Sequence, residues 1–312
     1  RDLDVPWGLV LRDDGSALVT LRDSGDVLHV HPGEDPVVLG TVPGLAPDGE
    51  GGLLGIAAAP EDPARIFVYL TTAEDNRVLR MRLADGELGP AEAVLTGIPR
   101  SSIHNGGRIA FGPDGHLYVA TGDASAAGAA QDPDSLAGKI LRVDTDGLPA
   151  PGNPAPGSPV WSLGHRNVQG LGWDDDGRMF ASEFGQNTWD ELNRIEPGGN
   201  YGWPEVEGTA GADGFIDPVQ QWRPAEASPS GIAVTADAVY VAALRGQSLW
   251  RVPLSEDGDT GEAQRLLHEE YGRLRTVVAD DGALWLLTSN TFRGSPAEDD
   301  DRVIVLDPAE LG

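Results

Sequence analysis

Six segments of this chain share one pattern of apolar and polar positions. Each starts with small or apolar residues, continues through an apolar strand and a short acidic turn, and ends in a second β-rich strand. A third strand follows, as in VLHV or KILRVD. The starts recur roughly every 45 to 62 residues, the size of a four-stranded propeller blade. The six segments begin at Trp7, Leu53, Gly106, Val168, Pro229 and Leu274.

This repeat predicts the fold class. Helical periodicity is nearly absent, and only a short stretch such as 262–270 fits a helical turn. Six copies of one antiparallel sheet predict an all-β, six-bladed β-propeller with four-stranded antiparallel blades, and residues 1–312 are expected to form a single domain. A β-sandwich is the alternative architecture, but it does not explain the repeat.

The predicted fold also indicates where functional residues gather. The innermost strands of a propeller converge on a central axis, and the loops at one face carry the functional groups. Residues directly before the first strand of each repeat are therefore candidates to line one rim. These candidates are Glu50, His104, Arg166 with Asn167, the loop 222–228, and Arg273 with Arg275.

One stretch, 161–204, is unusually dense in special residues. It contains a predicted β-hairpin between Gly170 and Glu183, with an Arg–Asn pair before it and a glycine-rich, carboxylate-bearing loop after it. This combination suits a polyanionic organic ligand held together with a hard cation. For any single residue here, a structural loop tied by Asn and Asp side chains is the alternative. The motifs concerned are GHRN, EFGQN, DELN and GGNYGWP.

Composition excludes several classes of function. A net charge of −28 argues against nucleic acid or an anionic membrane surface as a partner. Cysteine is absent, so disulfides, thiolate metal sites and cysteine nucleophiles are excluded. No apolar run approaches the ~20 residues that span a bilayer, and we expect no membrane insertion. The start at Arg1 lacks a signal-peptide pattern, which fits both an exported mature chain and one that was never exported.

Individual side chains carry candidate chemistry. His104 precedes a Gly–Gly pair that lets a ligand approach closely, so it is a candidate general base, although most lone histidines are surface or core residues. Arg273 and Arg275 alternate along a strand and share one face, where either carboxylates or a common anion compensate them. Glu191 and Tyr201, with Asp190, are candidates for calcium, with a capped acidic turn as the alternative. P-loop, HExxH and GxSxG motifs are absent.

At these residues the chain resembles the soluble quinoprotein aldose (glucose) dehydrogenases, which bind pyrroloquinoline quinone (PQQ) on a six-bladed propeller. The resemblance covers nearly the whole chain, with its motifs in the right order. The matching stretches are GEGGLLGIA, IHNGGRIAFGPDGHLYVATGD, GHRNVQGL, SEFGQNTWDELN, GGNYGWP, ALRG and RLRTV.

The resemblance implies a role for each motif. His104 would be the base that takes the proton from the anomeric hydroxyl of an aldose, with hydride passing to PQQ and electrons then to an external acceptor. Main-chain carbonyls of Gly185 and Gln186 would hold a calcium ion, while Glu191 and Tyr201 match a second, structural calcium site. Residues implied to hold PQQ are Arg166, Asn167, Leu244, Arg245, Arg273 and Arg275. Those implied to contact the sugar are Glu50, where the glucose enzyme has glutamine, and Trp222 as an aromatic wall.

The resemblance also implies the setting of the activity and its alternatives. The chain lacks the long insertions of the dimeric glucose-specific enzyme, which favours a monomer of the shorter, broad-specificity aldose branch. The family's usual location is periplasmic or extracellular. A calcium-dependent lactone hydrolase on the same architecture is one alternative, and it requires side-chain carboxylates and asparagines crowding the channel. A propeller that only binds a sugar or a protein partner is the other.

Overall fold

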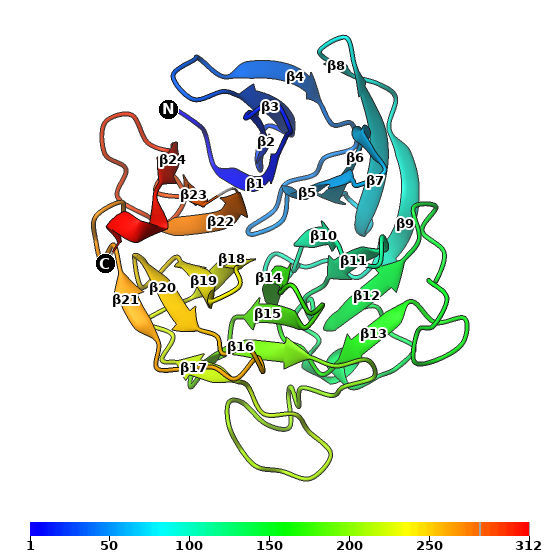
Figure 1. The fold of residues 1–312 in the computed structure, drawn as a ribbon. Coiled ribbons are helices and arrows are strands. Elements are labelled where there is room, and N and C mark those ends of the chain that lie inside the picture. The colour runs from blue at the N-terminus through cyan, green and yellow to red at the C-terminus, as the bar shows by residue number, and fades with distance from the viewer. Residues whose placement is uncertain (281, 312) are drawn as a thin grey trace.

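The computed structural model describes residues 1–280 and 282–311 and shows six antiparallel sheets arranged in a ring (Figure 1). The innermost strand of every sheet begins within three residues of a segment start identified in the sequence, so the six-bladed propeller is confirmed. The innermost strands are β1 (Pro6–Leu11), β5 (Leu53–Ala59), β10 (Ile109–Phe111), β14 (Val168–Trp173), β18 (Pro229–Val234) and β22 (Leu274–Asp280).

The strands pair in chain order from the centre outward, except that in the second blade both β8 and β9 pair with β7. In the first three blades the outer strands are β2 (Ala17–Leu21), β3 (Asp26–Val30), β4 (Val37–Thr41), β6 (Asp62–Thr71), β7 (Asn76–Ala84), β8 (Glu87–Leu88), β9 (Glu92–Ile98), β11 (Leu117–Ala120), β12 (Lys139–Val143) and β13 (Val160–Leu163). In the last three they are β15 (Met179–Glu183), β16 (Asp190–Ile195), β17 (Gln220–Trp222), β19 (Ala238–Ala243), β20 (Ser248–Pro253), β21 (Gln264–Leu266), β23 (Ala283–Thr288) and β24 (Val303–Leu306).

The blades differ in detail from the ideal of four strands. Four sheets have four strands, the second carries the short β8 in addition, and the last has three within the described residues. Two 3-10 helices, η1 (Ala127–Ala130) and η2 (Pro308–Glu310), complete the elements. The predicted helical turn at 262–270 is wrong, because residues 264–266 form β21 and pair with β20.

Small residues on the inner strands allow the blades to meet closely. A Cβ atom at Gly55 would collide with the carbonyl of Gly107 in the next blade, and one at Gly170 would collide with the carbonyl of Ser230. Side chains there would push neighbouring inner strands apart and widen the ring. Further out, apolar clusters between blades form the core, as around Phe67 and Tyr69.

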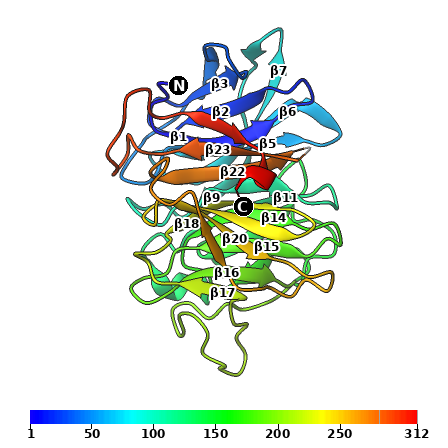
Figure 2. The same ribbon diagram turned by 60° about the vertical axis from the view of Figure 1, so that its left-hand side comes forward.

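The two chain ends close the ring. Leu3 and Asp301 exchange backbone hydrogen bonds of 2.9 and 3.0 Å, which join the segment before β1 to the segment before β24. Figures 1 and 2 show the first and last blades side by side. Within residues 1–280 and 282–311, no helix is long and apolar enough to cross a bilayer.

Candidate functional site

His104 lies between β9 and β10 in an unusual backbone conformation. Its φ is +59°, in the left-handed region that side chains seldom occupy and that costs roughly 1–2 kcal/mol. Its backbone N–H donates to a carboxylate oxygen of Glu50 at 3.2 Å. Its carbonyl packs where a Cβ atom on Gly122 would be, so Gly122 must remain glycine. These contacts hold the histidine at the rim with its side chain 14% exposed.

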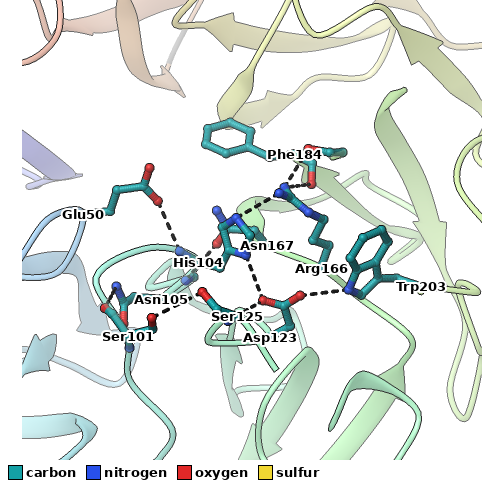
Figure 3. A network of polar contacts seen from close by, with 12 residues as sticks. Glu50, Ser101, His104, Asn105, Asp123, Ser125, Arg166, Asn167, Phe184 and Trp203 are labelled. Atoms are coloured by element: carbon teal, nitrogen blue, oxygen red, sulfur yellow. Dashed lines mark hydrogen bonds and ion pairs between the residues drawn. The ribbon is translucent and has the colours of Figure 1, made fainter. Parts of the chain in front are cut away.

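The hydrogen bonds of the His104 ring define its tautomer (Figure 3). Nδ1 lies 2.8 Å from Oδ1 of Asp123, and Nε2 lies 2.9 Å from Nη2 of Arg166. Burial raises the pKa of Asp123, but the bond to His104 and the bonds from Ser125 and Trp203 lower it more, so the carboxylate is ionised. An ionised carboxylate only accepts, and therefore Nδ1 carries the hydrogen, while the lone pair of Nε2 accepts from Arg166.

Asp123 is itself held from three sides. Besides the histidine, it accepts hydrogen bonds from Trp203 Nε1 at 2.9 Å and from the backbone N–H of Ser125 at 2.8 Å. The guanidinium of Arg166 lies 5.4 Å from the centre of the Trp203 ring. Sequence reasoning gave no role to Asp123 or Trp203. The one available signal was position, since Asp123 follows β11 at the same rim and both residues lie within the stretches that carry the family resemblance.

Arg166 connects the histidine to the loop after β15. Its Nη1 donates to the carbonyl of Gly185 at 2.6 Å, while Nη2 reaches His104. Its backbone N–H donates to Glu183, whose other carboxylate oxygen lies 2.8 Å from His165 Nδ1. Burial lowers the pKa of Arg166, and neighbouring carboxylates oppose that shift.

A cavity of about 270 Å³ opens beside this network. It contains five arginines, Arg22, Arg245, Arg273, Arg275 and Arg293, and one carboxylate, Glu50. Arg22 pairs with Asp23 and Arg293 pairs with Glu50, at 2.7 and 2.8 Å. The other three form no ion pair with any carboxylate of the described residues. The rest of the lining is Trp7, Asn105, Gly106, Gln169, Phe184, Ser228, Leu244 and Phe292.

Arg273, directly before β22, and Arg275, within it, are poorly compensated. Arg275 is buried and makes only long hydrogen bonds, of 3.3 Å to Gln169 and 3.4 Å to Ser230. Burial, and then the nearby Arg273, hold the pKa of Arg275 well below its usual value. Burial also lowers the pKa of Arg273.

Several buried donors around the cavity have no partner in the structure. They are Nε of Arg166, Arg273 and Arg275, and Nδ2 of Asn167. Buried donors without acceptors are costly, as are like charges without a counter-ion. The donor set therefore fits an organic polyanion that accepts several hydrogen bonds at once.

The loop 185–189 contains the two carbonyls predicted to bind calcium. The carbonyl of Gly185 faces Arg166, and the N–H groups of residues 186–189 all converge on one carboxylate oxygen of Glu207. Burial raises the pKa of Glu207, but these four hydrogen bonds lower it more. Across the described part of the chain, no group of three or more His, Cys, Asp or Glu side chains could hold a metal. A cation here would depend on main-chain oxygens and on a ligand.

The second predicted calcium pair makes other contacts. The carboxylate of Glu191 accepts from Gly208 N–H at 2.7 Å and from Asn193 Nδ2 at 3.0 Å. Burial, and then the charge of Glu183, raise its pKa to about 8. The Tyr201 hydroxyl donates to the carbonyl of Arg194 at 2.7 Å. The calcium role of this pair stays a prediction.

Most residues predicted to hold PQQ or to contact the sugar lie together, and one does not. Glu50, Leu244 and the arginines at 245, 273 and 275 line the cavity. His104 contacts Glu50, Arg166 contacts His104, and Asn167 Oδ1 accepts from the N–H of Gly106 in the lining at 3.0 Å. Trp222 instead packs in the core against Trp250, with ring centres 5.8 Å apart and 4% exposure. It is not an aromatic wall of the cavity, because its position in β17 directs the ring between blades. The aromatic residues that line the cavity are Trp7, Phe184 and Phe292.

Comparison with known proteins gives one consistent result. Residues 3–294 match the glucose/sorbosone dehydrogenase family. The PQQ-bound aldose sugar dehydrogenase of Streptomyces coelicolor is 53% identical, with a TM-score of 0.95 over 98% of this chain and 94% of that one. A putative glucose dehydrogenase of Thermus thermophilus is 41% identical, with a TM-score of 0.91 over 98% and 97%.

Curated relatives agree. The aldose sugar dehydrogenase YliI of Escherichia coli is 30% identical over 93% of this chain and 88% of its own length. Quinoprotein glucose dehydrogenase B of Acinetobacter calcoaceticus is 30% identical over 69% of this chain, which spans only 53% of that relative. The match to the family covers nearly the whole chain, including the arginine-rich cavity and the His–Asp pair beside it. This chain belongs to the glucose/sorbosone dehydrogenase family.

Proposed function

We propose that the protein is a PQQ- and calcium-dependent aldose dehydrogenase that oxidises the C1 hydroxyl of aldose sugars to lactones. The observation that carries the proposal is the cavity itself, where three uncompensated arginines and several unpartnered donors adjoin a histidine whose Nδ1 is bonded to Asp123, which leaves Nε2 as its proton acceptor. PQQ is a flat tricarboxylate, so its carboxylates suit this donor set. The PQQ-bound relative from Streptomyces coelicolor supports the same assignment.

The residues present fit both the cofactor and the cation. Side chains of Arg166, Asn167, Arg245, Arg273 and Arg275, with Leu244 beside them, would hold PQQ, and carbonyls of Gly185 and Gln186 would hold calcium. When bound, PQQ supplies a hydride acceptor, and calcium polarises it as a Lewis acid. We propose further that Glu191 and Tyr201 bind a second, structural calcium.

His104 then does the proton chemistry. Its Nε2 takes the proton of the C1 hydroxyl, while the C1–H bond breaks and its hydrogen leaves with the electron pair, giving the lactone. The Asp123 carboxylate stabilises the imidazolium that forms, as a buried carboxylate does for a general base. Arg166 covers Nε2 in this structure, so the sugar hydroxyl must replace that guanidinium. Glu50 holds the His104 backbone and lines the cavity, where it would contact the sugar.

The wider assignment follows the family. We propose a monomer that acts in the periplasm or outside the cell and passes its electrons to an external acceptor. The excess of arginine over carboxylate in the cavity disfavours the lactone hydrolase alternative, which needs anionic oxygen ligands.

One experiment tests the proposal. Purified protein is incubated with calcium and PQQ, and glucose and a redox dye are then added. Dye should be reduced only when PQQ and calcium are both present. His104→Ala should abolish reduction while PQQ still binds, whereas the control His31→Ala, at an exposed histidine of the first blade, should behave as wild type. Dye reduction without PQQ, or lactone hydrolysis in its place, contradicts the assignment.

A further inference from the structure

The carboxylate of Glu207 is enclosed by the loop 185–189, which carries the two carbonyls predicted to bind calcium. Its Oε1 accepts the backbone N–H of Gln186 at 2.7 Å, of Asn187 at 3.1 Å, of Thr188 at 3.0 Å and of Trp189 at 3.1 Å. Four consecutive amides on one oxygen form an anion-binding nest that the chain fills with its own carboxylate. That oxygen has no lone pair left for a metal, so Glu207 does not act as a ligand through it.

Peptide geometry connects this nest to the two carbonyls. In a trans peptide unit the N–H and the C=O lie in one plane and point in opposite directions. The N–H of Gln186 belongs to the same unit as the carbonyl of Gly185, and the N–H of Asn187 to the same unit as the carbonyl of Gln186. Because both N–H groups face Glu207, both carbonyls face away from it. The Gly185 carbonyl indeed meets Arg166, on the side of the cavity.

The loop is wrapped too tightly around the carboxylate for a different arrangement to fit easily. A Cβ atom on Gly185 would overlap the carbonyl of Trp189 and lie 2.7 Å from Glu207 Oε1. On the other side, Asp190 Oδ1 accepts the N–H of Gly185 at 3.0 Å. The peptide units at 185–187 are thus held by Glu207 and Asp190, with both carbonyls directed away from Glu207 and that of Gly185 accepting from Arg166 Nη1.

We propose that Glu207 is a positioning residue that orients the carbonyls of Gly185 and Gln186 and strengthens their binding of a divalent cation. The inference deepens the proposed function and rests on its calcium site. A carboxylate that accepts from an N–H polarises the whole peptide unit and increases the negative charge on its carbonyl oxygen. Its own charge adds long-range attraction for the cation.

The test compares calcium affinity in three variants. Calcium is titrated calorimetrically into the full chain at saturating PQQ, for wild type, Glu207→Ala and Glu207→Gln. Glu205→Ala is the matched control, because Glu205 is exposed, has the same charge and lies two residues away. We expect Glu207→Ala to weaken calcium binding by about 10- to 100-fold, the usual effect of losing a residue that orients metal ligands. Glu207→Gln keeps one acceptor oxygen and should be intermediate, and Glu205→Ala should stay within about twofold.

A second measurement separates positioning from a merely structural role. The melting temperature is measured with and without calcium at saturating PQQ. If Glu207 positions the ligands, the calcium-induced rise in Tm shrinks in Glu207→Ala; a structural role alone lowers both values equally and overturns the inference, as does unchanged calcium affinity. Wild type that binds no calcium would refute both the inference and the calcium site. Wild type that binds calcium but reduces no dye refutes the dehydrogenase alone.

Discussion

The most informative single change is Asp123→Asn, because it removes one charge from the centre of the His104 network and leaves the shape almost unchanged. The carboxylate accepts three hydrogen bonds, from the His104 ring, from Trp203 Nε1 and from the Ser125 N–H. An amide has one acceptor oxygen. If its NH₂ faces Trp203, one hydrogen bond is lost; if it faces His104, the ring hydrogen must move to Nε2, which can then no longer accept a proton.

The size of the effect follows from Coulomb's law. An imidazolium and a carboxylate at hydrogen-bond contact have charge centres roughly 4 Å apart, and at an effective dielectric constant of about 20 their attraction is about 4 kcal/mol. That attraction exists only after His104 has taken the proton, so losing it raises the barrier by the same amount. A barrier higher by about 4 kcal/mol lowers kcat by roughly 10³-fold, and we expect 10²- to 10⁴-fold.

The assay is steady-state glucose oxidation at saturating PQQ and calcium, together with a PQQ binding titration. Binding should change little, because Asp123 is not among the residues lining the cavity. The control is Ser125→Ala, which keeps the backbone N–H that donates to Asp123 and should retain kcat within about twofold. A kcat for Asp123→Asn within about threefold of wild type, with PQQ bound, would refute this account of the base.

Three further results are expected. Arg275→Met should raise the stability of the cofactor-free protein by about 1 kcal/mol in urea unfolding, because an uncompensated buried charge disappears, and should weaken PQQ binding; lower stability contradicts this. Lys139→Met should lower the free energy of unfolding by about 3 kcal/mol, because the Lys139 ammonium donates to three backbone carbonyls at 2.7 to 2.9 Å. A decrease of less than about 1 kcal/mol would contradict this prediction. The pKa of Glu191 is raised to about 8. In calcium-free buffer, its contribution to the free energy of unfolding should therefore be fully present below pH ~4.5 and lost as pH rises through ~8. Glu191→Gln should flatten that profile by on the order of 3 kcal/mol, and an unchanged slope contradicts the shift.

The fold was predictable because it depends on a local signal repeated six times. Each strand–turn–strand unit shows the same pattern of apolar and polar residues, so a wrong assignment in one segment does not change the predicted architecture. The short β21 shows the limit, since its three residues, 264–266, pair with β20 at the edge of a blade and are too few to show a strand pattern of their own.

Site residues were predictable where they lie directly before the inner strand of a blade, because residues at that position line one rim. That rule placed Glu50, His104 and Arg166 correctly at one rim, but it gives no information on contacts made by longer loops. Trp203 reaches Asp123 from a loop 80 positions away in the sequence, and no periodicity encodes such a contact. Trp222 was wrongly predicted to line the cavity, because in β17 its ring turns into the core.

The charge distribution explains why such a site lies in so acidic a protein. The chain carries a net charge of −28, yet its cavity contains five arginines and one carboxylate. Five of the 22 basic residues are concentrated in this one pocket, which attracts an anionic ligand there. The same concentration of charge is unfavourable without a bound anion, since burial lowers the pKa of Arg273 and Arg275 and their Nε donors have no partner among the described residues. A bound polyanion relieves both costs at once, so affinity for the cofactor and its stabilisation of the fold have one physical origin.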